Sequence, residues 1–388
     1  MLGYINRKKT NSIKWDWYEW NKHLFMEKDI LPMWVADMDF EAPEEVIHAL
    51  KERMEHGVYG YTFEPVDLKD NIINWLKYKH NWEIKKDWLL SMHGVIPALN
   101  FSIQLYTNPG DNILVQTPVY PPFMSSVKNN NRKLLINELK LENNHYEIDF
   151  DDFERKAKEA KMFILCSPHN PIGRVWKKNE LEKMAEICLK NDVLIVSDEI
   201  HADLTFKNFK HIPIASISEE VSNNTITLMA PSKTFNIAGF HYAFAIIKNV
   251  ELRNKFKNWI KQSGLFLHNI AGLVAANAAY KYGKNWLIET MEYIEENYKF
   301  VREYFEKNIP EVGVIKSEGT FLVWLDFRKL NLSQDELKDL LEKKAKIGLN
   351  NGITFGTNGE GFMRMNIATS RENVMEACKR IENVIKGE

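Results

Sequence analysis

Val193-Leu-Ile-Val-Ser-Asp198-Glu-Ile-His201 is an apolar run of strand length that ends directly in a carboxylate. Four similar short runs, separated by helix-length amphipathic segments, lie at residues 112–116, 162–166, 225–229 and 242–247. Runs that are apolar on both faces are typical of central strands in a mostly parallel sheet covered by helices on each side. Because chemistry in such sheets collects beyond the carboxyl ends of the strands, we expect polar residues at those ends to form the site.

Segments on either side of these runs predict helices and a second group of strands. Apolar residues at i, i+3 and i+4 spacing predict helices near residues 43–56, 66–78 and 94–105. A long charged helix is predicted over residues 286–306, followed by strands near 312–315, 320–326 and 362–367. The predicted fold class is α/β, with a large domain on a mostly parallel sheet and a smaller α+β domain.

The chain is longer than one ordinary core requires, so we expect about two domains. Its first 35 residues are rich in tryptophan but have no long helical or strand period, and we interpret them as an arm that lies on other surfaces. We predict an N-terminal arm with part of the small domain at residues 1–45, the large domain at 46–285 and the C-terminal small domain at 286–388.

Composition narrows the class of protein. The 388 residues are 45% hydrophobic and 27% charged, which suits a large core and argues against wholesale disorder. Lys plus Arg number 51 against 53 for Asp plus Glu, and the net charge of -2 gives no electrostatic reason to expect nucleic acid or an anionic membrane as the partner. We expect a small-molecule partner.

Cysteine usage and the apolar runs bear on the compartment. Cys166, Cys188 and Cys378 are odd in number and widely spaced, which fits a reducing compartment better than a disulfide framework. Residues 1–10 lack the apolar core of a signal peptide, and no run reaches the roughly 18 apolar residues that a membrane span needs. The expectation is a cytoplasmic protein.

Three predicted strands run into polar residues that suit a reactive site. Asp198 ends one strand, Lys233 follows the strand that ends at Met229, and Asn170 follows the strand that ends at Cys166. A buried carboxylate needs a cationic partner, and a partly desolvated lysine is a candidate Schiff-base nucleophile. Each residue also has an ordinary explanation: the Asp as a cap or ion pair, the Lys as a surface group, and the Asn as a turn former.

Two more segments complete the candidate site. Gly94-Val95-Ile96 begins a predicted helix, where free N–H groups and the helix dipole attract a phosphate. Tyr120 lies in a proline-rich turn and suits either ring stacking or packing. Each signal is weak alone, but a phosphate donor, an aromatic ring, an Asn, an Asp and a Lys occur in that order at helix starts and strand ends.

Four motifs carry a resemblance to a known family. They are Trp34-Val-Ala-Asp-Met-Asp-Phe40, Ser167-Pro-His-Asn-Pro-Ile-Gly-Arg174, Ser197-Asp-Glu-Ile-His-Ala-Asp203 and Pro231-Ser-Lys-Thr-Phe-Asn-Ile-Ala-Gly239. Over nearly its whole length the chain resembles the fold-type I pyridoxal-phosphate enzymes of the aminotransferase class I/II family. The motifs are similar to those of its cystathionine β-lyase, or C–S lyase, branch of MalY/PatB type. The resemblance implies a three-layer aminotransferase-like large domain that binds pyridoxal 5′-phosphate, and no metal.

The resemblance also implies a role for each candidate residue. Lys233 would hold the cofactor as a Schiff base and later carry the Cα proton as general acid and base. Asp198 would pair with the pyridinium nitrogen, so that the ring acts as an electron sink. Asn170 would bond the phenolic oxygen, and Tyr120 would stack on the ring. The phosphate would be held by Gly94, Val95, Ile96, Ser232 and Tyr61 of a neighbouring subunit, and the substrate by Ala36 and Arg364.

The chain departs from the general aminotransferase pattern at three positions. His201 stands where a tyrosine usually donates to the phenolic oxygen, and we assign it to the cofactor-binding set. His241 replaces the usual phosphate-binding arginine, and Ala230 replaces a serine, so the phosphate site is less cationic than expected. His201 and the Trp34 motif favour the lyase branch.

The implied reaction is α,β-elimination at L-cystathionine or another S-substituted L-cysteine, giving a thiol, pyruvate and ammonia. An aminotransferase shares the early steps, and the residues alone do not separate the two. A regulatory binding protein on the same fold is a third alternative. The resemblance further implies a homodimer with shared active sites.

Overall fold

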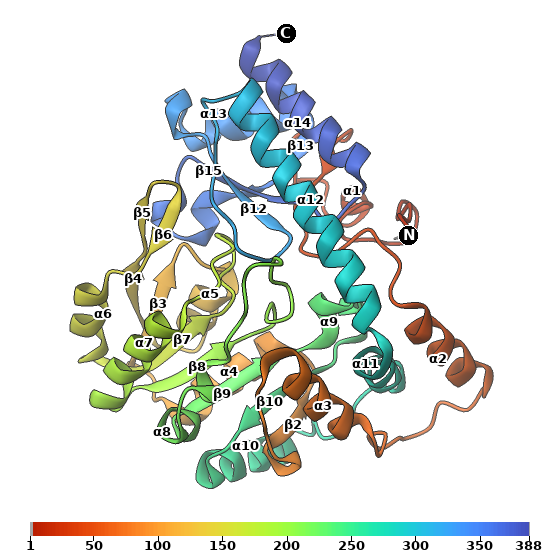
Figure 1. The fold of residues 1–388 in the computed structure, drawn as a ribbon, viewed down its shortest axis with the longest axis vertical. Coiled ribbons are helices and arrows are strands. Elements are labelled where there is room, and N and C mark those ends of the chain that lie inside the picture. Colours follow the sequence, from red (N-terminus) through yellow and green to blue (C-terminus); the bar gives the residue numbers. More distant parts are fainter. Residues whose placement is uncertain (1–2, 388) are drawn as a thin grey trace.

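In the computed structural model, which describes residues 3–387, the main sheet has seven strands in the order β2-β10-β9-β8-β7-β3-β4 (Figure 1). Its strands are β2 (Leu89–Met92), β3 (Asn112–Thr117), β4 (Lys133–Glu138), β7 (Ala160–Cys166), β8 (Leu194–Asp198), β9 (Thr225–Met229) and β10 (Ala243–Ile247). Neighbours from β9 to β4 are parallel, whereas β10 runs antiparallel to both β9 and β2. The predicted mostly parallel sheet is confirmed.

Helices surround this sheet and a smaller one. They are α1 (Trp17–Trp20), α2 (Glu44–Glu55), α3 (Leu68–His80), α4 (Val95–Tyr106), α5 (Pro121–Asn129), α6 (Phe150–Ala157), α7 (Lys178–Lys190), α8 (Glu219–Asn223), α9 (Pro231–Thr234), α10 (Val250–Gln262), α11 (Ile270–Tyr282), α12 (Lys284–Asn308), α13 (Gln334–Asp339) and α14 (Arg371–Lys386). The remaining strands are β1 (Leu31–Pro32), β5 (Lys140–Glu142), β6 (His145–Glu147), β11 (Gly313–Val314), β12 (Leu322–Asp326), β13 (Ile347–Gly348), β14 (Asn350–Asn351) and β15 (Phe362–Asn366).

Alternation along the central strands divides their side chains between two cores. Val115 and Val196 pack with residues of α4, α5 and α10 on one face of the sheet. Leu114, Phe163 and Ile195 pack with residues of α6, α7 and α8 on the other face. Both faces are buried, which explains why these strands are apolar at successive positions. The result is the three-layer arrangement that the sequence predicts.

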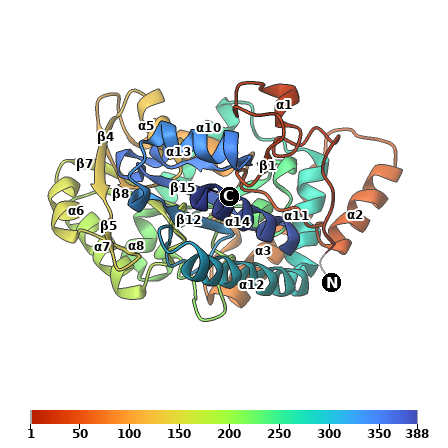
Figure 2. The same cartoon turned by 90° about the horizontal axis from the view of Figure 1, so that it is seen from above.

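A second sheet, in the order β11-β12-β15-β14, is antiparallel. The long helix α12 leads into it, and α12 and α14 lie side by side against it (Figure 2). The division of the chain at residues 45 and 285 stays a prediction, and residues 1, 2 and 388 of its outer parts lie outside the described residues.

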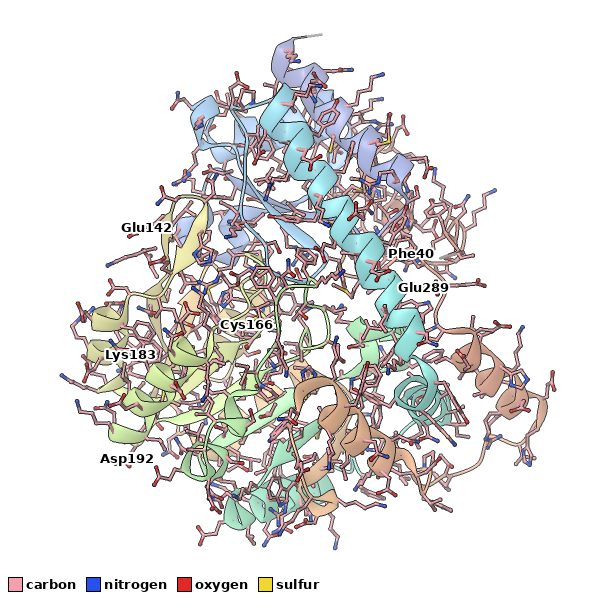
Figure 3. The ribbon with its side chains drawn as sticks, viewed as in Figure 1. Phe40, Glu142, Cys166, Lys183, Asp192 and Glu289 are labelled. Atoms are coloured by element: carbon pink, nitrogen blue, oxygen red, sulfur yellow. The ribbon has the colours of Figure 1, made fainter. Side chains whose placement is uncertain are left out.

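All three cysteines are buried and unpaired, as the sequence analysis expects. Cys166 ends β7 near the middle of the molecule, close to where the two sheets meet (Figure 3). No helix among residues 3–387 combines the length and apolarity that a bilayer span requires. The cytoplasmic location stays a prediction.

Ion pairs and a hydrogen bond hold the N-terminal arm against Asp37 and Asp39. Arg7 donates to both oxygens of Asp37, at 2.8 and 2.7 Å. Lys14 donates to Asp39 at 2.7 Å, and the side chains of this pair are fully buried. Trp15 Nε1 also donates to Asp39, at 2.8 Å. The arm therefore fixes the segment around residues 37–39 through a desolvated ion pair.

We expect the Lys14→Ala variant to lose about 1 to 3 kcal/mol of unfolding free energy, because Asp39 loses a fully buried charged donor and keeps only Arg7, at 3.1 Å, as an ion-pair partner. Urea titration of the variant measures the loss. Lys8→Ala is the control, since Lys8 is exposed in the same arm, and it is expected to change stability by about 0.5 kcal/mol or less. Equal stability of the two variants would contradict this account.

Candidate active site

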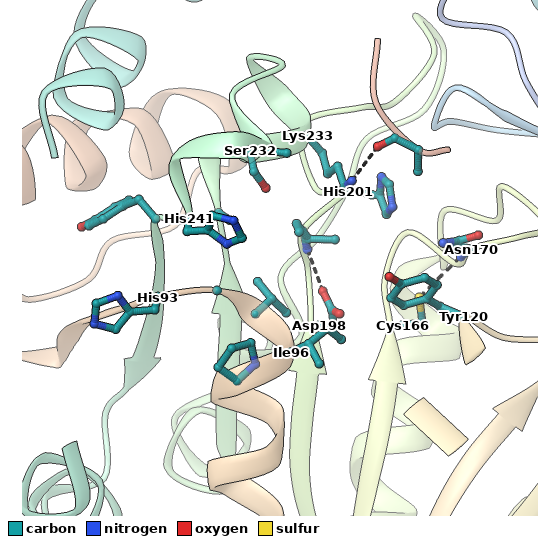
Figure 4. A pocket seen from close by; sticks show the side chains of 18 of the residues that line it. His93, Ile96, Tyr120, Cys166, Asn170, Asp198, His201, Ser232, Lys233 and His241 are labelled. Atoms are coloured by element: carbon teal, nitrogen blue, oxygen red, sulfur yellow. Dashed lines mark hydrogen bonds between the residues drawn. The ribbon is translucent and has the colours of Figure 1, made fainter. Parts of the chain in front are cut away.

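A cavity of about 370 Å³ lies beyond the carboxyl ends of β3, β7, β8 and β9 (Figure 4). Ten of the predicted site residues line it: Ala36, Gly94, Val95, Ile96, Tyr120, Asn170, Asp198, His201, Ser232 and Lys233. Tyr61 and Arg364 are not among its lining residues. Parallel neighbours in the sheet explain the convergence, because their carboxyl ends share one edge.

Asp198 is the last residue of β8, and its carboxylate has few hydrogen-bond donors and no ion-pair partner within the described residues. The side chain is buried, and the Ile200 N–H donates to its Oδ1 at 3.1 Å. Burial raises the pKa of Asp198 to about 7, against the lowering effect of the Ile200 bond and of Lys233. Among residues 3–387 no cation forms a salt bridge with it. A ligand with a cationic nitrogen would supply the missing partner.

Lys233 lies in α9, the turn directly after β9, and its Nζ donates to the Ala36 carbonyl oxygen at 2.5 Å. The pKa of Lys233 is lowered to about 8. Burial is the main cause and Arg364 adds to it, whereas Asp37 and Asp198 oppose the shift. The amine is therefore partly neutral near pH 8. A neutral amine in a cavity can attack a carbonyl group or accept a proton.

Arg364, on β15 of the small sheet, is a buried guanidinium beside the cavity. It donates to Asn170 Oδ1 at 3.1 Å, to the Trp34 carbonyl oxygen at 2.9 Å and to Asn350 Oδ1 at 2.5 Å. Within the described residues its Nε has no hydrogen-bond partner, and no carboxylate pairs with the group. Burial lowers the pKa of Arg364 to about 10. An anionic ligand such as a carboxylate would satisfy this charge.

One side of the cavity offers donors suited to an anion. Helix α4 begins at Val95 without a side-chain cap, so its first N–H groups are free. Ser232 and His241 lie on this side, opposite Tyr120 and Asn170 (Figure 4). The donor set fits a phosphate, with an imidazole in place of a permanent cation.

His201 lines the cavity as a neutral group. It is buried, and within the described residues its Nδ1 has no hydrogen-bond partner. The pKa of His201 is lowered to about 3, chiefly by burial and in addition by the charges of Lys233 and Arg364. A neutral imidazole with a free ring nitrogen can bond a ligand without adding charge to the site.

Tyr61 lies away from this cavity. Its side chain is 97% exposed, in a shallow hollow that Tyr59, Leu267 and His268 also line. Within one chain, therefore, the structure does not bring Tyr61 to the other predicted residues.

Sequence reasoning missed several members of the site. His93 and Tyr242 line the cavity, and Asn350 holds Arg364. His93 precedes the predicted Gly94 segment and Tyr242 follows His241, so closeness in sequence is a usable signal for these two. Asn350 is the first residue of the two-residue strand β14, and no sequence pattern marks it as part of a site.

The chain is similar to known proteins over nearly its whole length. The model of the family described as aminotransferase class I and II matches residues 28–381. Cystathionine beta-lyase PatB of Bacillus subtilis is 41% identical over 97% of each chain. A PLP-bound putative aminotransferase from Clostridium difficile superposes with a TM-score of 0.96 at 46% identity, covering 99% of this chain and 98% of that one. Cystalysin from Treponema denticola, which contains pyridoxal 5′-phosphate, superposes with a TM-score of 0.95 at 38% identity, with coverage of 99% and 98%.

The raised pKa of Asp198 predicts how stability depends on pH in the cofactor-free protein. Between about pH 4 and pH 7 the unfolded carboxyl ionises while the folded one keeps its proton, so this group lowers stability as pH rises. We expect Asp198→Asn to match the wild type near pH 4 and to exceed it above pH 7. The gain should approach roughly 4 kcal/mol as an upper figure.

Urea titrations at both pH values measure the difference. Asp29→Asn is the matched control, because the Asp29 side chain is 90% exposed. An Asp198→Asn gain that is the same at both pH values would contradict the assignment.

Proposed function

Because the chain belongs to the aminotransferase class I and II family and to its PatB/MalY-type branch of C–S lyases, we propose that it cleaves the Cβ–S bond of L-cystathionine or another S-substituted L-cysteine. The observation that carries the proposal is a set of three charged groups: the buried side chains of Asp198 and Arg364 and the half-buried side chain of Lys233. Asp198 and Lys233 line one cavity, Arg364 lies beside it and donates to Asn170 of its lining, and within the described residues the three form no salt bridges to one another. The overall reaction takes up water and releases a thiol, pyruvate and ammonia.

The cofactor of this reaction is pyridoxal 5′-phosphate, and the residues present fit it. The Asp198 carboxylate provides the partner for a protonated ring nitrogen, and the free N–H groups of α4 with Ser232 provide a phosphate cradle. When bound, the cofactor supplies an aldehyde that links to amines and a ring that takes up the electron pair left at a substrate carbon. Tyr120 would stack on that ring, and Asn170 and His201 would bond its polar edge.

Two side chains act on the substrate itself. Arg364 would bind the substrate carboxylate, with its unpartnered Nε–H as one donor, and so orient the Cα–H bond toward the lysine. Lys233 accepts the Cα proton, since its lowered pKa of about 8 leaves a neutral amine available near neutral pH. The thiolate then leaves from Cβ. In the cofactor-free protein the Ala36 carbonyl oxygen accepts a hydrogen bond from Lys233 Nζ and holds the amine beside the cavity.

An aminotransferase remains the alternative, because it begins with the same proton removal by Lys233. The name of the putative aminotransferase from Clostridium difficile favours it, and the name cystathionine beta-lyase PatB favours the lyase. The two activities differ in their products: a lyase releases thiol and pyruvate, whereas an aminotransferase leaves the amino group on the cofactor.

We expect the cofactor-loaded protein to release thiol and pyruvate from L-cystathionine in equal amounts, measured by thiol titration and a coupled lactate dehydrogenase assay. Lys233→Ala should lower the rate by about 10³-fold or more, because the general base is lost. Lys161→Ala is the control, since Lys161 is exposed on β7.

Conversion of the cofactor to its pyridoxamine form without thiol would contradict the lyase and support the aminotransferase. Full activity of Lys233→Ala would contradict the role of the lysine in either reaction.

We also propose a homodimer with shared sites. Tyr61 is 97% exposed and Phe63 is 81% exposed, and together with Val58, Tyr59 and Phe266 they form an exposed apolar surface. Such a surface is typical of a protein interface. Across a twofold axis the loop around residue 60 would offer the partner subunit's Tyr61 to the cofactor phosphate, which completes a cradle that lacks a permanent cation.

Mixing two inactive variants tests the shared site. Tyr61→Ala and Lys233→Ala subunits, each inactive alone, should regain about a quarter of wild-type activity after co-refolding. Half of the dimers are then hybrids, and each hybrid has one intact site. Wild-type activity in a species that ultracentrifugation shows to be monomeric would refute the proposal.

A further inference from the structure

The motif Ser197-Asp-Glu-Ile-His-Ala-Asp203 contains three carboxylates, and the proposed function uses one of them. Asp198 lines the cavity, whereas Glu199 and Asp203 do not. Both are buried, with exposed fractions of 1% and 3%. A fully buried carboxylate is unfavourable unless several donors satisfy it, so each of these two side chains calls for a structural reason.

Asp203 is satisfied by three donors from two helices. Trp75 Nε1 donates to its Oδ1 at 3.1 Å, and His80 Nε2 lies 2.8 Å from the same oxygen. The Thr234 hydroxyl donates to Oδ2 at 2.9 Å. Burial alone would raise the pKa of Asp203, but the bonds from His80 and Thr234 outweigh it and hold that pKa below its usual value. Burial lowers the pKa of His80, against the raising effect of Asp203.

The position of these bonds in the chain is informative. Asp203 comes five residues after Asp198, and Thr234 comes one residue after Lys233. The Asp203–Thr234 bond therefore joins the loop after β8 to the turn after β9, which are the two segments that carry the carboxylate and the amine of the site.

The other end of the same loop is also anchored. Glu199 Oε1 accepts from the Ser197 hydroxyl at 2.8 Å and from the Ile214 N–H at 3.2 Å. Its Oε2 lies 2.8 Å from His211 Nε2, and the His211 ring packs edge-on against the ring of His80 at 5.3 Å. Residues 199–203 are thus held at both ends by buried carboxylates. Helix α9, with four residues, is too short to fix its own orientation.

We propose that Asp203 is a positioning residue that, through the Thr234 hydroxyl, sets the direction of Lys233 relative to Asp198. The proposal rests on the proposed function, in which both residues act on one cofactor. Misplacement of a reacting group by about 1 Å can lower a rate by about 10²-fold, so a bond one residue from the lysine has a measurable effect.

Three variants isolate this bond. Thr234→Val removes the hydroxyl while keeping the shape of the side chain, and Thr234→Ser keeps the hydroxyl. Thr227→Val is the matched control: Thr227 is buried on β9, the strand that leads to Lys233, and within the described residues its hydroxyl has no partner. Asp203→Asn is the second test of the same bond, for use if Thr234→Val does not fold.

Two readouts are taken on the cofactor-loaded protein. The first is the pH midpoint of the visible absorbance change of the cofactor attached to Lys233, recorded without substrate. Asp37, Asp198 and Arg364 act on the charge of the Lys233 amine in the cofactor-free protein. A change in the direction of the Lys233 side chain relative to these groups is therefore expected to move the midpoint. The second is the pair of kinetic constants kcat and KM, measured separately with L-cystathionine as substrate.

We expect Thr234→Val to shift the midpoint by several tenths of a pH unit and to lower kcat about tenfold, with KM changed by about twofold or less. Thr234→Ser and Thr227→Val should keep the wild-type midpoint. A Thr234→Val protein that is less heat-stable but has the wild-type midpoint and kcat would overturn the proposal, because the bond would then be structural. Since the midpoint needs no substrate, it decides the role of Asp203 even if L-cystathionine proves to be the wrong substrate.

Discussion

Two opposite charges lie at the ends of neighbouring parallel strands and form no salt bridge with each other among residues 3–387, and the rest of the site depends on them. Asp198 ends β8 and Lys233 follows β9, and each is desolvated enough that burial moves its pKa toward neutrality, to about 7 and about 8. A protein that only needed stability would place apolar residues there. The unpaired charges instead define a site that is complete only with a ligand carrying a cationic nitrogen and a group that reacts with an amine.

Much of the fold follows from local sequence patterns. Runs such as residues 193–197 are apolar on both faces because helices cover both faces of the sheet, and this predicted the central strands. The antiparallel direction of β10 was not predictable, since an apolar run looks the same in either direction. Strands β2 and β4 were also missed. They lie at the two edges of the sheet, where β4 is only partly buried and carries polar residues that weaken the strand pattern.

Some residues of the site were predictable from local sequence patterns, and others were not. Polar residues that follow shortly after a predicted strand were predictable, because the carboxyl ends of parallel strands share one edge. Asn170 and Lys233, each four residues after a predicted strand end, are examples. The groups that hold them were not. Asp203 bonds Thr234 across 31 residues, and Arg364 bonds Asn350 from another strand of the small sheet. Such contacts depend on tertiary packing, and no periodicity in the sequence marks them. Under the proposed homodimer, the place of Tyr61 depends in addition on a second subunit.

The central claim is that Lys233 is the residue that carries the cofactor opposite Asp198. Borohydride reduction of the protein loaded with pyridoxal 5′-phosphate, followed by proteolysis and mass spectrometry, tests it most directly. The account predicts one phosphopyridoxyl group per chain, on the peptide that contains Lys233, and none on the other lysines. A stoichiometric adduct on any other lysine, with Lys233 unmodified, would contradict it.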